Sequence, residues 1–173
     1  DGVILTGFGK EEIPLEKIDF WHEVVPVLDH VKERKIPMLA SCWGSHAALH
    51  RYHNIGKHCD MTDKISGAFE QKVTAPHHPL MKGLNETIAM PVSRYGRSSD
   101  QEIEGNSNLV VLARSAETGT AIVTDIDGDV LYLTGHPEYN RSSLPAEYFR
   151  DIETGTPHLR VPKNIFQYDV PRR

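Results

Sequence analysis

Cys42 is the residue of this chain best placed to act as a nucleophile. It follows an apolar run at 36–40, which predicts a buried strand, and precedes a helix-compatible stretch at 45–51. A sharp turn between a strand and a helix holds a side chain above the sheet, where the helix amides stabilise a thiolate. The amide of Trp43 would point toward a developing oxyanion. The alternative is that Cys42 is a small apolar residue buried beneath the helix, which is the commonest role of a cysteine outside a disulfide.

His136 and Glu138 supply the base and the orienting carboxylate that a thiol nucleophile needs. They lie in the segment Gly135-His136-Pro137-Glu138-Tyr139, directly after a predicted strand at 130–134. If that strand is a parallel neighbour of the strand before Cys42, the two strand ends meet at one edge of the sheet. Pro137 stiffens the link, and Glu138 can bend back to hold the imidazole tautomer. Nine other histidines compete for this role, and it is position that favours His136.

Three histidines, His46, His50 and His53, share the predicted helix after Cys42 at spacings that could bind zinc. No acidic or thiol partner lies at a ligand spacing, so we expect no metal site and a polar helix face instead.

The remaining pattern predicts a three-layer α/β domain with a mixed sheet. A first strand at 3–6 ends at Gly7-Phe8-Gly9, and an amphipathic helix at 20–31 follows Asp19 as its N-cap. Further strands are expected at 66–73, 87–90, 109–113, 119–124 and 130–134, the last two joined as a hairpin through Asp127-Gly128. The segment 54–83 is expected to be mostly loops, and 143–151 to be a helix.

Composition favours small-molecule chemistry by a globular protein. Of the 173 residues, 39% are hydrophobic, and no apolar run approaches the roughly 20 residues of a membrane helix. The basic residues are scattered and the formal charge is -5, which argues against a nucleic-acid partner. Two cysteines, Cys42 and Cys59, in unlike surroundings indicate a reducing compartment, so we expect the cytoplasm, with a structural role for Cys59. We expect one domain over 1–173, without a signal peptide, that lacks N- and C-terminal parts of a larger fold.

The order of seven segments resembles the homoserine O-succinyltransferase and O-acetyltransferase family. These segments are Asp1-Gly2-Val3-Ile4-Leu5-Thr6-Gly7, Cys42-Trp43-Gly44, Lys64-Ile65-Ser66-Gly67, Pro91-Val92-Ser93-Arg94-Tyr95, Gly135-His136-Pro137-Glu138-Tyr139, Glu147-Tyr148-Phe149-Arg150-Asp151 and Val161-Pro162-Lys163-Asn164. The resemblance implies a flavodoxin-like, class I glutamine amidotransferase-like fold with a mostly parallel sheet and an antiparallel hairpin.

The resemblance also implies the chemistry. Cys42 would take an acyl group from acyl-CoA as a thioester, with His136 as general base and Glu138 supporting it, in a ping-pong reaction of methionine biosynthesis. The acceptor would be the hydroxyl of L-homoserine, held by three residues. These are Lys64, Ser93 and Arg150. No bound cofactor or metal is implied, acetyl-CoA is a co-substrate, and a homodimer is compatible with the family.

Glu11 aligns with the position at which the family distinguishes acetyl from succinyl donors, and a glutamate there is similar to the acetyl-using members. A carboxylate would repel the free carboxylate of a succinyl group, so we expect acetyl transfer. The alternative is that Glu11 is a solvated charge beside Glu12.

The chain departs from the family pattern at three places. Gly7-Phe8-Gly9 stands where the family has Gly-Ala-Pro, which affects the second oxyanion donor and the acyl pocket. His46 replaces a glutamine and Val92 a histidine, which could signal another acceptor, such as serine, or a specialised pathway. The family's N-terminal region and C-terminal helix have no counterpart here.

Three alternatives stay open. The donor could be succinyl-CoA, or the acceptor serine-like. The same Cys, His and Glu could serve a glutamine amidotransferase or related hydrolase, which would need a partner to receive ammonia and would leave the lysine, serine and arginine set unexplained. Finally, the chain could bind an amino acid or CoA without turnover.

Overall fold

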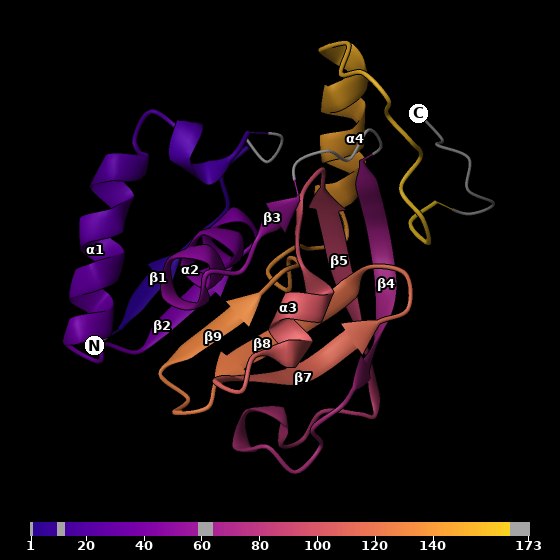
Figure 1. The fold of residues 1–173 in the computed structure, drawn as a ribbon. Coiled ribbons are helices and arrows are strands. Elements are labelled where there is room, and N and C mark those ends of the chain that lie inside the picture. The colour runs from indigo at the N-terminus through magenta and orange to yellow at the C-terminus, as the bar shows by residue number, and fades with distance from the viewer. Residues whose placement is uncertain (1, 10–12, 59–63, 167–173) are drawn as a thin grey trace.

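A seven-stranded sheet forms the centre of the molecule, with strand order β1-β2-β9-β8-β7-β4-β5 (Figure 1). The computed structural model describes residues 2–9, 13–58 and 64–166. The strands of this sheet are β1 (Val3–Leu5), β2 (Met38–Ser41), β4 (Ile65–Val73), β5 (Thr87–Arg94), β7 (Leu109–Ser115), β8 (Gly119–Asp125) and β9 (Val130–Leu133). Two short strands, β3 (Lys57–His58) and β6 (Arg97–Ser98), form a separate antiparallel pair.

The helices are α1 (Trp21–Glu33), α2 (Trp43–His53), α3 (Asp100–Gly105) and α4 (Ser143–Glu153), with 3-10 turns η1 (Leu15–Lys17) and η2 (Pro79–Met81). The predicted helices at 20–31, 45–51 and 143–151 are therefore present, whereas α3 was not predicted. Asp19 does not cap α1, whose N-cap position is Phe20, and Pro26 lies inside the helix.

Parallel pairing is limited to one side of the sheet, where β1 pairs with β2 and β2 with β9. The pairs β9 with β8, β8 with β7, β7 with β4 and β4 with β5 are all antiparallel. Antiparallel pairing thus extends beyond the single hairpin that was predicted. For β7, β8 and β9 the reason lies in the connections: the links at 116–118 and 126–129 are far too short for the crossover that a parallel neighbour requires.

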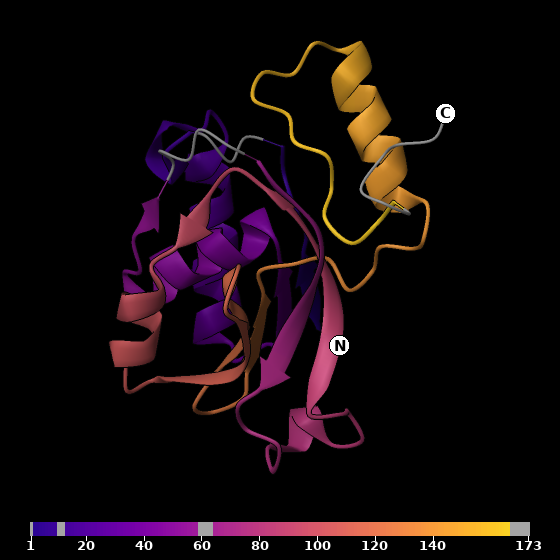
Figure 2. The ribbon, with the colours of Figure 1, turned by 90° about the vertical axis from the view of Figure 1, so that its right-hand side faces the viewer.

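One face of the sheet is covered by helices. The largest core cluster joins Leu28 of α1, Leu49 of α2 and Ile103 of α3 to Val123 and Tyr132 of the sheet. Figure 2 shows α1, α2 and α3 together on one side, so they form one outer layer of the α/β fold. In both views α4 stands apart, beyond the end of the sheet at which β5 ends and β4 begins.

Asp125, at the end of β8, ties two helices to the sheet. Its Oδ2 accepts from Lys32 Nζ of α1 at 2.9 Å. Its Oδ1 accepts from Tyr132 Oη of β9 at 2.7 Å and lies 2.9 Å from His53 Nε2 of α2. Burial raises the pKa of Asp125, but these hydrogen bonds outweigh it and hold the pKa below its ordinary value. The carboxylate is therefore charged and fixes how α1 and α2 lie on the sheet.

Within residues 2–9, 13–58 and 64–166, no helix combines the length and apolar character needed to cross a bilayer.

Candidate active site

Cys42 occupies a strained turn between β2 and α2. Its backbone has φ 52° and ψ -121°, a conformation that non-glycine residues rarely adopt and that costs of the order of 1–3 kcal/mol. Two backbone bonds hold it: the Cys42 amide donates to Leu133 O at 2.8 Å, and its carbonyl accepts from the His46 amide at 3.2 Å. At Gly44 a Cβ would lie 2.5 Å from Leu5 O, so only glycine lets α2 start this close to β1.

His136 follows β9, the parallel neighbour of β2, as the strand-end argument requires. Its amide donates to Pro91 O at 2.8 Å, and its Nδ1 lies 2.7 Å from Glu138 Oε1. The ring is buried and stacks on Tyr139, with 4.2 Å between ring centroids and 20° between planes. Both the loop backbone and the imidazole are therefore fixed, and Nε2 is the nitrogen left for other chemistry.

Gly7 brings the thiol and the imidazole to one place. A Cβ added to Gly7 would lie 3.6 Å from Cys42 Sγ and 3.8 Å from His136 Cε1, so both side chains border the same point. They open into one cavity of about 760 Å³. The cavity is lined by Thr6, Gly7, Phe8, Gly9, Cys42, Lys64, Ser93, Tyr95, His136, Glu138, Tyr139, Glu147, Arg150, Asp151, Thr156, Pro157 and His158.

A charged cluster between β4 and α4 forms another part of the cavity wall. Lys64 Nζ lies 2.6 Å from Asp151 Oδ2 and 3.1 Å from Glu147 Oε1. Arg150 Nη2 lies 2.8 Å from Asp151 Oδ1 and 3.6 Å from Glu147 Oε1. We call these four residues the α4 charge cluster; its two cations and two anions balance.

The protonation states of the α4 charge cluster follow from its geometry. Burial lowers the pKa of Lys64, but the hydrogen bonds to Asp151 and Glu147 outweigh it and hold the pKa above its ordinary value. Burial likewise raises the pKa of Asp151, yet hydrogen bonds from Lys64 and Arg150 hold it below its ordinary value. Lys64 is thus a cation, suited to binding an anion and unsuited to acting as a base.

Tyr139 and Ser93 present hydroxyls to the same cavity. Burial, followed by the charges of Glu147 and Cys42, raises the pKa of Tyr139 above its ordinary value, so this hydroxyl stays protonated. Ser93 Oγ is buried, and within the described part of the chain nothing hydrogen-bonds it. A buried hydroxyl without a partner costs free energy, which a ligand that bonds it would recover.

The structure brings together most of the residues that were singled out from the sequence. The cavity is lined by Cys42, His136, Glu138, Lys64, Ser93 and Arg150. Trp43 lies beside them as the first residue of α2, where its amide has no partner within the helix. Glu11 and Cys59 lie outside the described residues.

Sequence reasoning gave no role to three cavity residues that surround the charged groups: Tyr139, Glu147 and Asp151. The sequence did contain a signal for Glu147 and Asp151. Arg150 and Asp151 follow Glu147 by three and four residues, so all three share one face of the helix. Their role as ion-pair partners of Lys64 becomes apparent only in the folded structure, where Lys64 lies opposite them.

The other histidines of the helix after Cys42 have separate partners. His46 Nδ1 lies 2.7 Å from Ser98 Oγ, His50 Nε2 lies 2.8 Å from Glu16 Oε1, and His53 bonds Asp125. Burial, with the nearby Arg94 and Lys57 charges, holds the pKa of His46 well below its ordinary value, so it is neutral. Nowhere in the described residues do three His, Cys, Asp or Glu side chains gather as a metal site.

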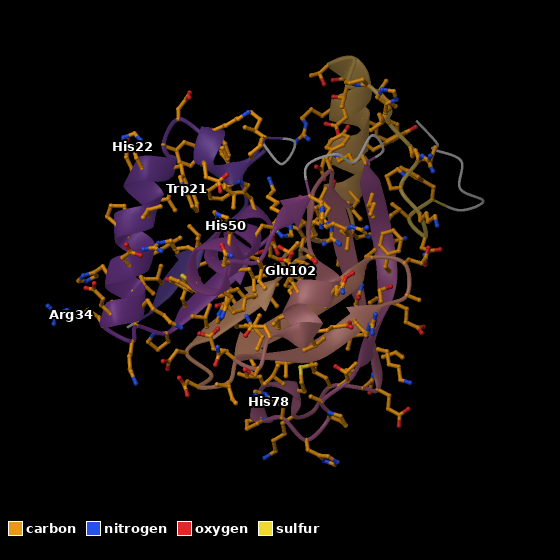
Figure 3. The ribbon with its side chains drawn as sticks, viewed as in Figure 1. Trp21, His22, Arg34, His50, His78 and Glu102 are labelled. Atoms are coloured by element: carbon orange, nitrogen blue, oxygen red, sulfur yellow. The ribbon has the colours of Figure 1, made fainter. Side chains whose placement is uncertain are left out.

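Figure 3 locates further side chains away from the cavity. His22 and Arg34 lie on the outer side of α1, and His78 lies at the end of the molecule opposite α4. Trp21 and His50 face one another where α1 meets α2, with ring centroids 6.1 Å apart. His158 does line the cavity but is exposed, whereas His136 is buried against its carboxylate.

Solved structures of low sequence identity share this fold. A glutamine amidotransferase from Thermotoga maritima matches with a TM-score of 0.70 at 13% identity, covering 88% of this chain and 64% of that one. A glutamine amidotransferase from Methylobacillus flagellatus matches with a TM-score of 0.67 at 11% identity, covering 95% of this chain and 61% of that one. The predicted glutamine amidotransferase-like fold is therefore confirmed.

Sequence relatives are much closer. Homoserine O-acetyltransferase of Petrotoga mobilis is 35% identical over 173 residues, which are 100% of this chain and 55% of that protein. Homoserine O-acetyltransferase of Lachnoclostridium phytofermentans is 36% identical over 169 residues, or 98% of this chain and 56% of that protein. This chain thus spans slightly more than half the length of these relatives.

A sequence profile of the homoserine O-succinyltransferase family matches the chain over residues 1–173. The profile and the relatives both carry the names of homoserine O-acyltransferases, but the acyl group is succinyl in the profile and acetyl in the relatives. The chain belongs to the homoserine O-succinyltransferase family.

Proposed function

We propose that this chain catalyses the acetyl-CoA-dependent O-acylation of L-homoserine through a thioester on Cys42. The observation that carries the proposal is the shared cavity: a strained turn presents Cys42 beside an imidazole whose Nδ1 is bonded to Glu138 at 2.7 Å. Its relatives are homoserine O-acetyltransferases, which supports both the donor and the acceptor. We place the reaction in amino-acid biosynthesis, with methionine as the end product, in the cytoplasm.

The first half-reaction forms the thioester. Because Glu138 bonds Nδ1–H, His136 Nε2 carries the lone pair that accepts the Cys42 proton. The thiolate sulfur attacks the thioester carbonyl of acetyl-CoA, and the oxyanion of the tetrahedral intermediate bonds the Trp43 amide at the start of α2. The bond to the CoA sulfur then breaks, and the departing CoA thiolate takes the proton from the imidazolium. The products are acetyl-Cys42 and CoA thiol.

The second half-reaction transfers the acetyl group to an alcohol. His136 Nε2 accepts the hydroxyl proton of homoserine as its oxygen attacks the acetyl carbonyl. The carbon–sulfur bond breaks, and the Cys42 thiolate recovers the proton from the imidazolium. The products are the O-acetyl ester and the original thiol, so the same three groups serve both halves.

The α4 charge cluster suits a zwitterionic amino acid. Arg150 is largely exposed toward solvent, so its guanidinium can take the substrate carboxylate, while Lys64 adds positive charge from the buried side. Glu147 can accept a hydrogen bond from the substrate ammonium. Ser93 Oγ, which has no hydrogen-bond partner among the described residues, can then bond the acceptor near its reacting end.

For the donor, we propose acetyl on the basis of Glu11 and the relatives. A carboxylate at this position would repel a succinyl carboxylate. Comparing CoA release from acetyl-CoA and succinyl-CoA tests this directly, and a preference for succinyl-CoA would overturn the acetyl assignment. Serine run beside homoserine tests the acceptor in the same way.

The decisive experiment follows CoA thiol release from acetyl-CoA and L-homoserine for the wild type and for Cys42→Ala. We expect release by the wild type and none above background by the variant. Intact mass of the wild type with acetyl-CoA alone should show one acetyl group that is missing in Cys42→Ala. Equal rates of CoA release in both proteins would refute the proposal, as would ammonia release from glutamine in place of acetyl transfer. Binding of acetyl-CoA without an acetyl adduct or turnover would show that the chain is a binding protein only.

A further inference from the structure

An aromatic side chain that follows Gly7 in the chain lines the cavity. Phe8 lines the cavity and is 38% exposed. Its neighbour Gly7 packs directly against the nucleophile, because a Cβ on Gly7 would lie 3.3 Å from Cys42 Cβ. Phe8 is therefore one residue removed from contact with the group that would carry the acyl chain.

The Phe8 ring is held by other aromatic rings. Its centroid lies 4.7 Å from that of Phe20 at 83° between planes, and 5.8 Å from that of Trp43 at 73°. Phe20 and Trp43 also contact each other, with centroids 5.8 Å apart, and Trp43 is almost fully buried. Such edge-to-face packing is the favoured arrangement of aromatic pairs, so turning the Phe8 ring away would break both contacts.

The Phe8 ring that lines the cavity contains only carbon and hydrogen and offers no hydrogen-bond donor. An acyl group on Cys42 that extends toward Phe8 meets a fixed ring, which limits its length and offers nothing to a terminal carboxylate. The cationic lining residues Lys64 and Arg150 belong to the α4 charge cluster, which the proposed acceptor amino acid would occupy. A short uncharged acyl group therefore satisfies this end of the cavity best.

We propose that Phe8 is a specificity-determining residue that restricts the acyl donor to short, uncharged groups. This inference rests on the proposed acyltransferase function and names the part of the site that selects the donor. It is independent of Glu11, because a wall acts on the length of an uncharged chain, whereas a glutamate acts on the charge of the donor.

A series of uncharged donors tests the wall. We would measure kcat/KM for acetyl-, propionyl- and butyryl-CoA with L-homoserine in the full chain, for the wild type and Phe8→Ala. Each methylene that fits or fails to fit an apolar pocket changes kcat/KM by about tenfold or more. We therefore expect Phe8→Ala to raise the butyryl-to-acetyl ratio at least about tenfold.

Two further variants and one control sharpen the result. Phe8→Trp enlarges the wall and should lower the propionyl-to-acetyl ratio, which keeps the test informative if Phe8→Ala fails to fold. Phe20→Ala removes one of the two rings that hold Phe8 and should raise the butyryl-to-acetyl ratio by less than Phe8→Ala. Val27, exposed on α1, gives the control Val27→Ala, which should leave the ratio unchanged.

The outcomes separate this inference from the proposed function. Unchanged donor ratios in both Phe8 variants, with acetyl turnover intact, would overturn the role of Phe8 and leave the acyltransferase proposal standing. Absence of CoA release from every donor in the folded wild type would instead refute the acyltransferase proposal itself.

Discussion

Replacing Asp151 by asparagine should loosen the attachment of α4 to the sheet. Both Asp151 and Lys64 expose only 8% of their side chains, and they lie 2.6 Å apart. Removing one partner of a buried ion pair costs about 3–5 kcal/mol when the other is left without compensation. Lys64 keeps Glu147 at 3.1 Å, so we expect a smaller loss of unfolding free energy, about 2–3 kcal/mol.

Thermal and urea unfolding would measure this loss. For a chain of this size each kcal/mol lowers the melting temperature by about 2–4 °C, so Asp151→Asn should melt about 4–12 °C below the wild type. Glu153→Gln, an exposed charge change on the same helix, is the matched control and should shift stability by no more than about 0.5 kcal/mol.

The loss of unfolding free energy in Asp151→Asn should also depend on pH, and it should shrink as the pH falls. The folded-state pKa of Asp151 is held below its ordinary value of 3.8 by Lys64 and Arg150. A carboxylate with a depressed pKa stabilises the fold fully above its unfolded pKa, and that contribution disappears as the pH falls through the folded pKa. The gap between wild type and Asp151→Asn should therefore be constant near neutrality and close below about pH 4.

Two results would refute this reasoning. If Asp151→Asn unfolds within about 0.5 kcal/mol of the wild type, the ion pair contributes nothing beyond an ordinary surface charge. If the gap persists unchanged well below pH 4, the effect comes from packing of the side chain and not from its charge.

Three other substitutions probe the site and its scaffold. Glu138→Gln should lower kcat for CoA release about tenfold to a hundredfold. This is less than the roughly 10⁴-fold loss typical of a buried orienting carboxylate, because the Glu138 side chain is 52% exposed. An unchanged kcat would show that Glu138 has no part in the mechanism. Gly135→Ala places a Cβ 2.7 Å from Pro91 O and should cost about 1–3 kcal/mol in urea unfolding, whereas Gly105→Ala, with open space around it, should be neutral or mildly stabilising. Asp125→Asn should lower the unfolding free energy by about 2–4 kcal/mol, and a neutral result would show that its hydrogen bonds do not fix the helices.

That Cys42 and His136 line one cavity was predictable because their signals are local. Cys42 and His136 each follow an apolar strand, and parallel strands that are neighbours bring such ends together. What the sequence could not supply was the neighbour relation itself, since β2 and β9 are separated by six other strands along the chain. Tertiary packing decides this, and the bond from the Cys42 amide to Leu133 O is its local expression.

The short helix α3 was not predicted from the sequence, for a different reason. Its only buried residue is Ile103, so the apolar periodicity on which helix prediction depends is missing. A local signal was nevertheless present: Ser99 and Glu102 have capping-box spacing, and Ser99 Oγ accepts from the Glu102 amide at 3.3 Å. Capping residues alone would have located this helix.

Different interactions hold the part of the cavity around Cys42, where we propose that the donor reacts, and the part around the α4 charge cluster, where we propose that the acceptor binds. This difference decides which part tolerates substitutions more readily. Cys42 is fixed by its backbone hydrogen bonds and by the close approach of Gly44 to β1, and its neighbour Trp43 packs on Phe8, so substitutions there disturb the core. The acceptor part depends on side-chain ion pairs between Lys64 and α4, which can rearrange while the backbone stays in place. A change of the proposed acceptor would therefore require only new side chains at Lys64, at Ser93 and on α4, whereas a change of the proposed donor would have to reshape the strained turn or its aromatic neighbours.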